Sequence, residues 1–402
     1  MLQSLALIFL VGLAMAAICQ KCRLPRIIGM LLTGVVLGPY VLNLLDPSIL
    51  SISAQLRQIA LIIILIKAGL SLNLSDLKQV GRPAILMSCV PACFEILAYL
   101  LFAPLLLGIS PIEAAVMGAV LAAVSPAVVV PRMVQLMEMK YGTRKSIPQL
   151  IMAGASCDDV FVIVLFSAFL GMAQGAGIHL SDFAQIPLSI LLGIGLGALV
   201  GYLLSLFFET AYAHKHMVRN SMKVIVVLGT AFLLLSVEDW LKPVVSLSGL
   251  LAVVSMACVL KIRCIPSVAG RLSEKFGKLW LAAEVLLFVL VGAAVDIRYT
   301  VGAGFPAVAM ILTALLVRSI GVWVCLLKTS LNVRERLFCV IAYLPKATVQ
   351  AAIGSVPLAM GLPCGQLVLS VAVLAILITA PLGALGMDLS YFKWLTKEST
   401  SE

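Results

Sequence analysis

Residues 118–131 read Gly118-Ala-Val-Leu-Ala-Ala-Val-Ser-Pro-Ala-Val-Val-Val-Pro131, an apolar stretch interrupted by a proline. A second apolar stretch reads Val340-Ile-Ala-Tyr-Leu-Pro-Lys-Ala-Thr-Val-Gln-Ala-Ala-Ile-Gly354. Proline removes a backbone donor and clashes with the preceding turn, so a helix must kink or open at each place. Interrupted membrane segments in corresponding places of two halves are typical of secondary transporters with inverted repeats. We therefore predict two crossing broken helices, although chance prolines in a protein of many spans are the alternative.

Composition places the whole chain in a membrane. A mean hydropathy of +1.15, with 62% hydrophobic and 11% charged residues, excludes an ordinary soluble protein. Apolar stretches of spanning length recur throughout, which predicts an all-α polytopic membrane protein with about thirteen transmembrane helices. The loops are too short to fold alone, so residues 1–402 form a single membrane domain. The predicted spans lie near residues 2–18, 27–45, 58–74, 83–107, 112–131, 148–172, 183–208, 221–237, 243–260, 278–295, 303–327, 335–355 and 364–387.

Positive charge is distributed unevenly over the predicted loops. Alternate loops and the tail carry most of the 28 Lys and Arg residues, whereas the opposite loops hold only Arg57, Lys242 and Arg298. The positive-inside rule then predicts a multi-pass protein of the cell (inner) membrane, with the N-terminus outside and the C-terminus cytoplasmic. The net charge of +10 is explained by this topology, so we expect anionic lipid headgroups at the cytoplasmic face and no nucleic acid as partners.

Two adjacent acids, Asp158 and Asp159, lie within the apolar run 152–166. Carboxylates at bilayer depth are costly and mark ion or proton pathways. Loss of hydration disfavours the charged form, and a like-charged neighbour adds to that effect. Such a group holds a proton or, when ionised, binds a cation, and competition for one site is sufficient for exchange. Carbonyls freed near Val124 and Ser125 could complete an oxygen shell for Na⁺ or Li⁺. The alternative is a buried pair that Arg318 or Lys346 merely neutralises.

Other charged residues also fall within predicted spans. Glu95 lies 30 residues before Ser125, and Arg318 lies 28 before Lys346, so the first member of each pair occupies a nearly equivalent place in its half. A buried guanidinium must find a partner, which predicts a Glu95–Arg318 ion pair with a structural or gating role rather than a direct role in transport. Lys346 could neutralise the negative ends of half-helices where the helices cross. We interpret Lys67 as structural and Glu284 as interfacial.

These motifs together resemble those of the monovalent cation:proton antiporter superfamily, and within it the NHA-type branch of sodium/proton antiporters. The resemblance rests on residues 123–131, 154–160 and 344–354, with a Gly-rich stretch at 25–39 in support. It implies a thirteen-helix homodimer without a cofactor, whose ion-transporting core moves like an elevator. Dimerisation helices are expected near 1–45 and 183–260, and the core near 58–172 and 278–387.

The resemblance also assigns roles to the charged residues. It implies that Asp158 and Asp159 carry the exchanged ions, with Asp159 the more direct ligand of Na⁺ or Li⁺. Many members with two aspartates have a lysine where this chain has Arg318, and that lysine pairs with the first aspartate. An arginine paired with Glu95 would leave Asp158 free to titrate.

We therefore expect a secondary-active Na⁺ (or Li⁺)/H⁺ antiporter with no enzymatic activity. The alternatives are a K⁺/H⁺ antiporter or a cation efflux channel of the same fold, and a sodium-coupled symporter. Ion selectivity, stoichiometry, electrogenicity and the pH set point do not follow from the sequence.

Overall fold

The computed structural model describes residues 1–22, 24–71, 80–174, 180–213, 220–241, 247–296 and 304–397. These residues are predominantly helical, and they contain ten helical segments long and apolar enough to cross a membrane, when α6 with α7 and α8 with α9 are each counted as one. The predicted all-α membrane fold is thus confirmed. Three further predicted spans, near 27–45, 243–260 and 335–355, correspond to shorter or interrupted helices, so the total of thirteen stays a prediction.

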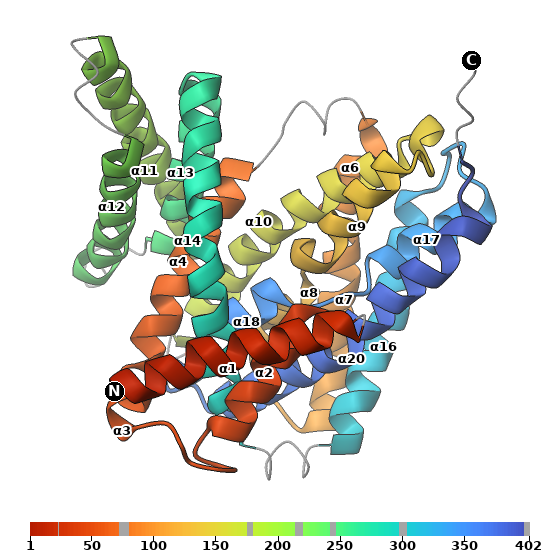
Figure 1. Cartoon of the computed structure of the whole chain (residues 1–402), viewed down its shortest axis with the longest axis horizontal. Coiled ribbons are helices and arrows are strands. Elements are labelled where there is room, and N and C mark those ends of the chain that lie inside the picture. The colour runs from red at the N-terminus through yellow and green to blue at the C-terminus, as the bar shows by residue number, and fades with distance from the viewer. Residues whose placement is uncertain are drawn as a thin grey trace. The chain divides into compact units, whose positions relative to one another are not determined.

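Figure 1 labels most of the helices by their numbers in chain order. Their bounds are α1 Leu2–Lys21, α2 Arg26–Leu37, α3 Pro47–Ser51, α4 Ser53–Ser71, α6 Arg82–Met87, α7 Val90–Leu107, α8 Pro111–Ala122, α9 Pro126–Glu138, the 3₁₀ helix η1 Thr143–Lys145, α10 Ile147–Gln174, α11 Leu180–Ala213, α12 Asn220–Leu241, α13 Gly249–Arg263, α14 Pro266–Ala293, α16 Gly304–Cys325, α17 Val333–Ala342, α18 Thr348–Gly354, α19 Val356–Ala359 and α20 Gly365–Trp394.

Packing divides the chain into two compact units. The first unit contains residues 1–54, 73–162 and 285–402, and the second contains residues 55–72 and 163–284. The division follows contacts within one chain, so the predicted dimerisation and core regions stay predictions. All the charged residues around the predicted breaks belong to the first unit.

Both predicted helix breaks are present in the first unit. The chain leaves helical geometry between α8 and α9 at residues 123–125, and between α17 and α18 at residues 343–347. Pro126 is the first residue of α9, a position where the missing proline N–H costs no helical hydrogen bond. α8 and α17 both begin with a capping box, Ser110 with Glu113 and Asn332 with Glu335. The two broken helices therefore begin with the same N-terminal capping motif.

Neighbouring helices of the first unit hold these breaks in place. α7 packs against α8 and against α16, which brings Glu95 and Arg318 toward the same region. α20 packs against α17, α18, α8 and α9. Close contact with the second break requires a glycine, because a Cβ on Gly383 of α20 would lie 2.4 Å from the Pro345 Cγ. Both breaks are consequently enclosed by helices on more than one side.

Several residues expected in loops lie within helices instead. The expected loop 261–277 is mostly helical, since α13 continues to Arg263 and α14 starts at Pro266. Arg57, expected in an outside loop, is buried in α4. Hydropathy windows end a span at the first charges, whereas a helix continues past them into the headgroup region. Six of the basic residues used for the orientation lie outside the described residues, namely Arg23, Lys78, Lys215, Arg219, Lys242 and Arg298.

Candidate ion-binding site

The two helix breaks are joined directly by their backbones. Residues 123–125 are extended, with φ −70° and ψ 144° at Ala123 and φ −90° and ψ 109° at Ser125. The Ser125 N–H donates to the Pro345 carbonyl at 2.8 Å. Each break frees backbone groups that a continuous helix would pair internally. This hydrogen bond pairs a free N–H of the first break with a free carbonyl of the second break.

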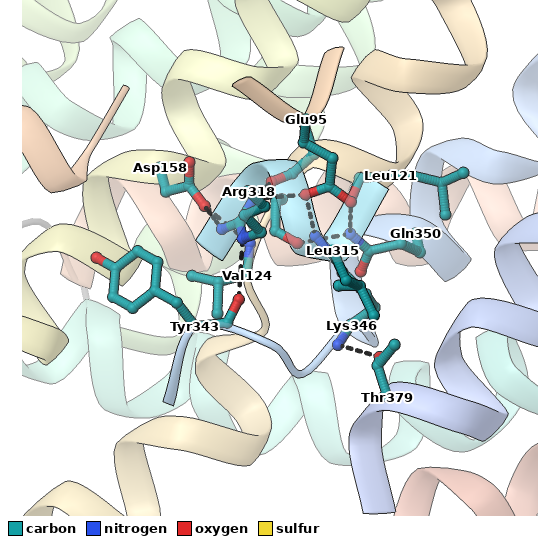
Figure 2. Close-up of polar contacts among 12 residues, drawn as sticks. Glu95, Leu121, Val124, Asp158, Leu315, Arg318, Tyr343, Lys346, Gln350 and Thr379 are labelled. Carbon is teal, nitrogen blue, oxygen red and sulfur yellow. Dashed lines mark hydrogen bonds and ion pairs between the residues drawn. The ribbon is translucent and has the colours of Figure 1, made fainter. Parts of the chain in front are cut away.

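Asp158 of α10 faces the first break. Its Oδ2 accepts a hydrogen bond from the Val124 N–H at 2.8 Å and lies 3.3 Å from Arg318 Nη2 (Figure 2). The Asp158 side chain is fully buried. A carboxylate at this depth is stabilised by the backbone donor and by the guanidinium together. Asp158 is therefore bound to the break that the sequence predicts to bear ligands for a cation.

Glu95 of α7 lies between two cations. Its Oε2 is 2.7 Å from Arg318 Nη1 and 2.6 Å from Lys346 Nζ, and all three side chains are almost fully buried (Figure 2). The Arg318 guanidinium also donates to the carbonyls of Tyr343, at 2.9 Å, and of Ala122. Arg318 thereby contacts both breaks as well as both carboxylates.

The expected contact between Glu95 and Arg318 is present, but Arg318 also contacts Asp158, so its pairing with Glu95 does not keep it away from that aspartate. The fork of a guanidinium carries donors on several sides, so one arginine can serve Glu95 through Nη1 and Asp158 through Nη2. Lys346, expected to neutralise half-helix ends, instead makes an ion pair with Glu95. The structural or gating role of this network stays a prediction.

Three buried oxygens near the first break have no hydrogen-bond partner among the residues that the structure describes. They are Ser125 Oγ, Asp158 Oδ1 and Asp159 Oδ1. Buried polar atoms in native proteins are nearly always satisfied, so each such oxygen indicates a proton, a water or an ion that completes it. Asp158 and Asp159 are adjacent in the chain, and Asp158 binds the peptide N–H directly before Ser125. Asp158 and Ser125 therefore lie at neighbouring peptide groups of the break, and Asp159 is the next residue of α10.

Sequence reasoning missed two polar residues at the breaks. Gln350 of α18 donates from Nε2 to the Ala123 carbonyl at 2.8 Å, and its Oε1 accepts from the Ala347 N–H at 2.8 Å. Thr379 of α20 accepts from the Lys346 N–H at 2.8 Å. Gln350 follows Lys346 by four residues in a mostly apolar segment, and this spacing was the available signal.

The remaining intramembrane charges lie in the second unit. Lys67 Nζ lies 5.7 Å from the centre of the Trp280 ring, a distance at which a cation is attracted to the ring face. Glu284 is on the same helix as Trp280, one turn further along. This arrangement agrees with the structural interpretation of Lys67.

An all-helical membrane protein with two interrupted helices, joined at their breaks beside buried carboxylates, has the architecture of a secondary-active ion transporter. Comparison with known proteins specifies the class further. The family described as "Sodium/hydrogen exchanger, transmembrane" matches residues 5–388. The chain therefore belongs to the sodium/hydrogen exchanger family, whose members transport ions and are not enzymes.

Individual relatives agree with this assignment. The chain is 33% identical to sodium/hydrogen exchanger 9B2 of Mus musculus over 377 residues, covering 90% of this chain and 67% of the relative. It is 32% identical to sodium/hydrogen exchanger 9B1 of Homo sapiens over 399 residues, covering 93% and 73%. The fold matches that of the sodium proton antiporter MjNhaP1 from Methanocaldococcus jannaschii with a TM-score of 0.82 over 98% of both chains, at 22% identity.

Proposed function

We propose that this protein is a secondary-active antiporter that exchanges Na⁺ or Li⁺ for H⁺ across the cell membrane, with Asp158 and Asp159 as the shared binding site. The observation that carries the proposal is the group of buried, unpartnered oxygens on Ser125, Asp158 and Asp159. Carboxylate, hydroxyl and carbonyl oxygens suit small hard cations. A proton can occupy the same carboxylates, so the two substrates exclude one another.

The charge balance of the buried cluster supports this competition. The cluster contains three carboxylates, Glu95, Asp158 and Asp159, but only two cations, Arg318 and Lys346. With every group ionised, the cluster carries one uncompensated negative charge in a region of low dielectric. One bound Na⁺ or one bound H⁺ neutralises it. The site thus favours occupancy by a single cation, whichever is in excess on the side to which the site is open.

Three further features are part of the proposal. The protein forms a homodimer through helices near 1–45 and 183–260, and its core near 58–172 and 278–387 carries the ion between the two faces. Its N-terminus lies outside and its C-terminus in the cytoplasm, which the uneven distribution of basic residues supports. Light scattering of the detergent-solubilised protein would measure the oligomeric state.

Replacement of the aspartates tests the binding site. We expect Asp159→Asn to abolish sodium-dependent proton movement in proteoliposomes, because the amide can neither release a proton nor supply a full negative charge. Asp158→Asn abolishes or severely impairs it. Glu274→Gln is a matched control, since this carboxylate on α14 is exposed and pairs with Lys278 one turn along its own helix. Normal exchange by Asp159→Asn would refute the mechanism.

The same preparation separates the alternative functions. Proton flux is compared with sodium, lithium and potassium, each without any organic solute. A potassium response larger than the sodium response would indicate a K⁺/H⁺ antiporter. Dissipation of a cation gradient without opposite proton movement would indicate a channel. Proton movement with sodium alone excludes a solute symporter.

A further inference from the structure

Among the residues that the structure describes, Gln350 is the one uncharged side chain that forms hydrogen bonds with both helix breaks. It is fully buried, and the donor and the acceptor of its amide contact different segments. Nε2 donates to the Ala123 carbonyl at 2.8 Å and reaches the Leu121 carbonyl at 3.4 Å. Oε1 accepts from the Ala347 N–H at 2.8 Å. One amide thereby serves the C-terminal carbonyls of α8 and the N-terminal donor of α18.

The extended segment 123–125 has two edges, because successive peptide groups of an extended chain point in opposite directions. On one edge, the Ala123 carbonyl accepts a hydrogen bond from Gln350, and the Ser125 N–H donates one to the Pro345 carbonyl. On the other edge, the Val124 N–H binds Asp158. The Ala123 carbonyl and the Ser125 N–H thus face the second broken helix. Because the direction alternates, the Val124 N–H and the Val124 carbonyl face the opposite side, where Asp158 lies.

We infer that Gln350 is a positioning residue for cation binding. Its Nε2 fixes the edge of the segment 123–125 that faces away from Asp158. The Val124 N–H then faces Asp158, and the Val124 carbonyl is presented to the bound cation. Without this donor, the Ala123 carbonyl loses its side-chain partner, and rotation of the peptide between Ala123 and Val124 withdraws the Val124 N–H from Asp158. Gln350 itself touches no transported ion. This inference rests on the proposed site at Asp158 and Asp159.

Two substitutions at Gln350 separate its donor from its acceptor. Gln350→Met has a similar length and removes both functions. Gln350→Glu keeps an oxygen for the Ala347 N–H, but a carboxylate cannot donate to the Ala123 carbonyl. Gln135→Met on α9 is the matched control, because Gln135 is exposed and lies outside the breaks. Full-length variants are reconstituted in proteoliposomes, and proton flux is measured as a function of sodium concentration.

We expect both Gln350 variants to raise the half-saturating sodium concentration about tenfold, the effect of roughly one well-formed hydrogen bond, with a smaller change in maximal rate. The control keeps wild-type values. A wild-type sodium response in Gln350→Met would overturn the inference, because this variant removes the donor without adding charge. An equal loss of maximal rate and affinity in both variants would also overturn it. If Gln350→Met does not fold, Gln350→Leu replaces it, because leucine also removes the donor and adds no charge.

Failure of this inference is distinguishable from failure of the proposed function. If the wild-type protein moves no protons in response to sodium, the proposed function fails. If the wild-type protein exchanges, Asp159→Asn does not, and both Gln350 variants bind sodium normally, only the positioning role is refuted.

Discussion

Glu95 is central to the buried charge network because one of its oxygens, Oε2, contacts both cations. Arg318 Nη1 lies 2.7 Å from it and Lys346 Nζ 2.6 Å. Asp158, by contrast, contacts one cation and one backbone N–H. Removal of one partner from a buried ion pair costs more than the pair contributes, because the remaining charge stays buried. We therefore expect Glu95 to matter first for stability and the aspartates to matter first for transport.

Replacement of Glu95 tests this division at the scale of a residue. We expect Glu95→Gln to destabilise the protein by about 3–5 kcal/mol, since Arg318 and Lys346 would remain buried without this carboxylate. Thermal unfolding in detergent measures the effect, with Glu113→Gln as a control for the loss of a partly exposed carboxylate that caps α8. A cap contributes only about 1 kcal/mol. An unchanged melting temperature together with an altered sodium affinity would reassign Glu95 to ion coupling.

The helix breaks require support from their neighbours, and α20 provides it in two ways. Thr379 accepts from the Lys346 N–H, and one turn further along, Gly383 lets α20 approach the ring of Pro345. A proline ring is rigid, so it cannot move aside as a flexible side chain would. The geometry of the second break thus depends on a small residue at position 383.

Gly383→Ala tests this contact at the scale of an element. The added Cβ would lie 2.4 Å from the Pro345 Cγ and 2.6 Å from its Cδ, so either α20 or the break must shift. We expect a loss of about 1–3 kcal/mol in stability, the usual cost of overpacking, and a reduced rate of exchange.

Gly171→Ala on α10 is the matched control for this substitution, since a Cβ there meets no atom within 4 Å. Alanine favours a helix over glycine, so the control keeps or gains stability. Equal stability and equal exchange rates in the two variants would show that the contact does not constrain the break.

At the scale of the whole molecule, the question is how much charge crosses the membrane in one cycle. The buried cluster contains one more carboxylate than it has cations, and under the proposed function one Na⁺ or one H⁺ balances that charge. A site that carries one Na⁺ in one direction and one H⁺ in the other moves no net charge. The geometry therefore favours one-for-one, electroneutral exchange.

Electroneutral exchange predicts a rate that does not depend on the membrane potential. A potential of about 100 mV is worth about 2.3 kcal/mol per elementary charge moved, which would change the rate or the equilibrium visibly. Sodium-driven proton flux in proteoliposomes is measured at zero potential and with a potassium diffusion potential clamped by an ionophore. We expect equal fluxes. A flux that rises severalfold with an inside-negative potential would require a second proton per cation, released from a further group in the cluster.

The sequence by itself determined the helical membrane fold and the two helix breaks, and it singled out Glu95, Asp158, Arg318 and Lys346, which the structure brings together. These inferences depend on local chemistry: proline opens a helix whatever surrounds it, and a carboxylate within an apolar run is costly whatever its partner. Only the tertiary structure decided how the charges pair. Arg318 serves Asp158 as well as Glu95, and Gln350 joins both breaks, because residues more than 150 positions apart meet where the broken helices cross. No local pattern encodes those distances.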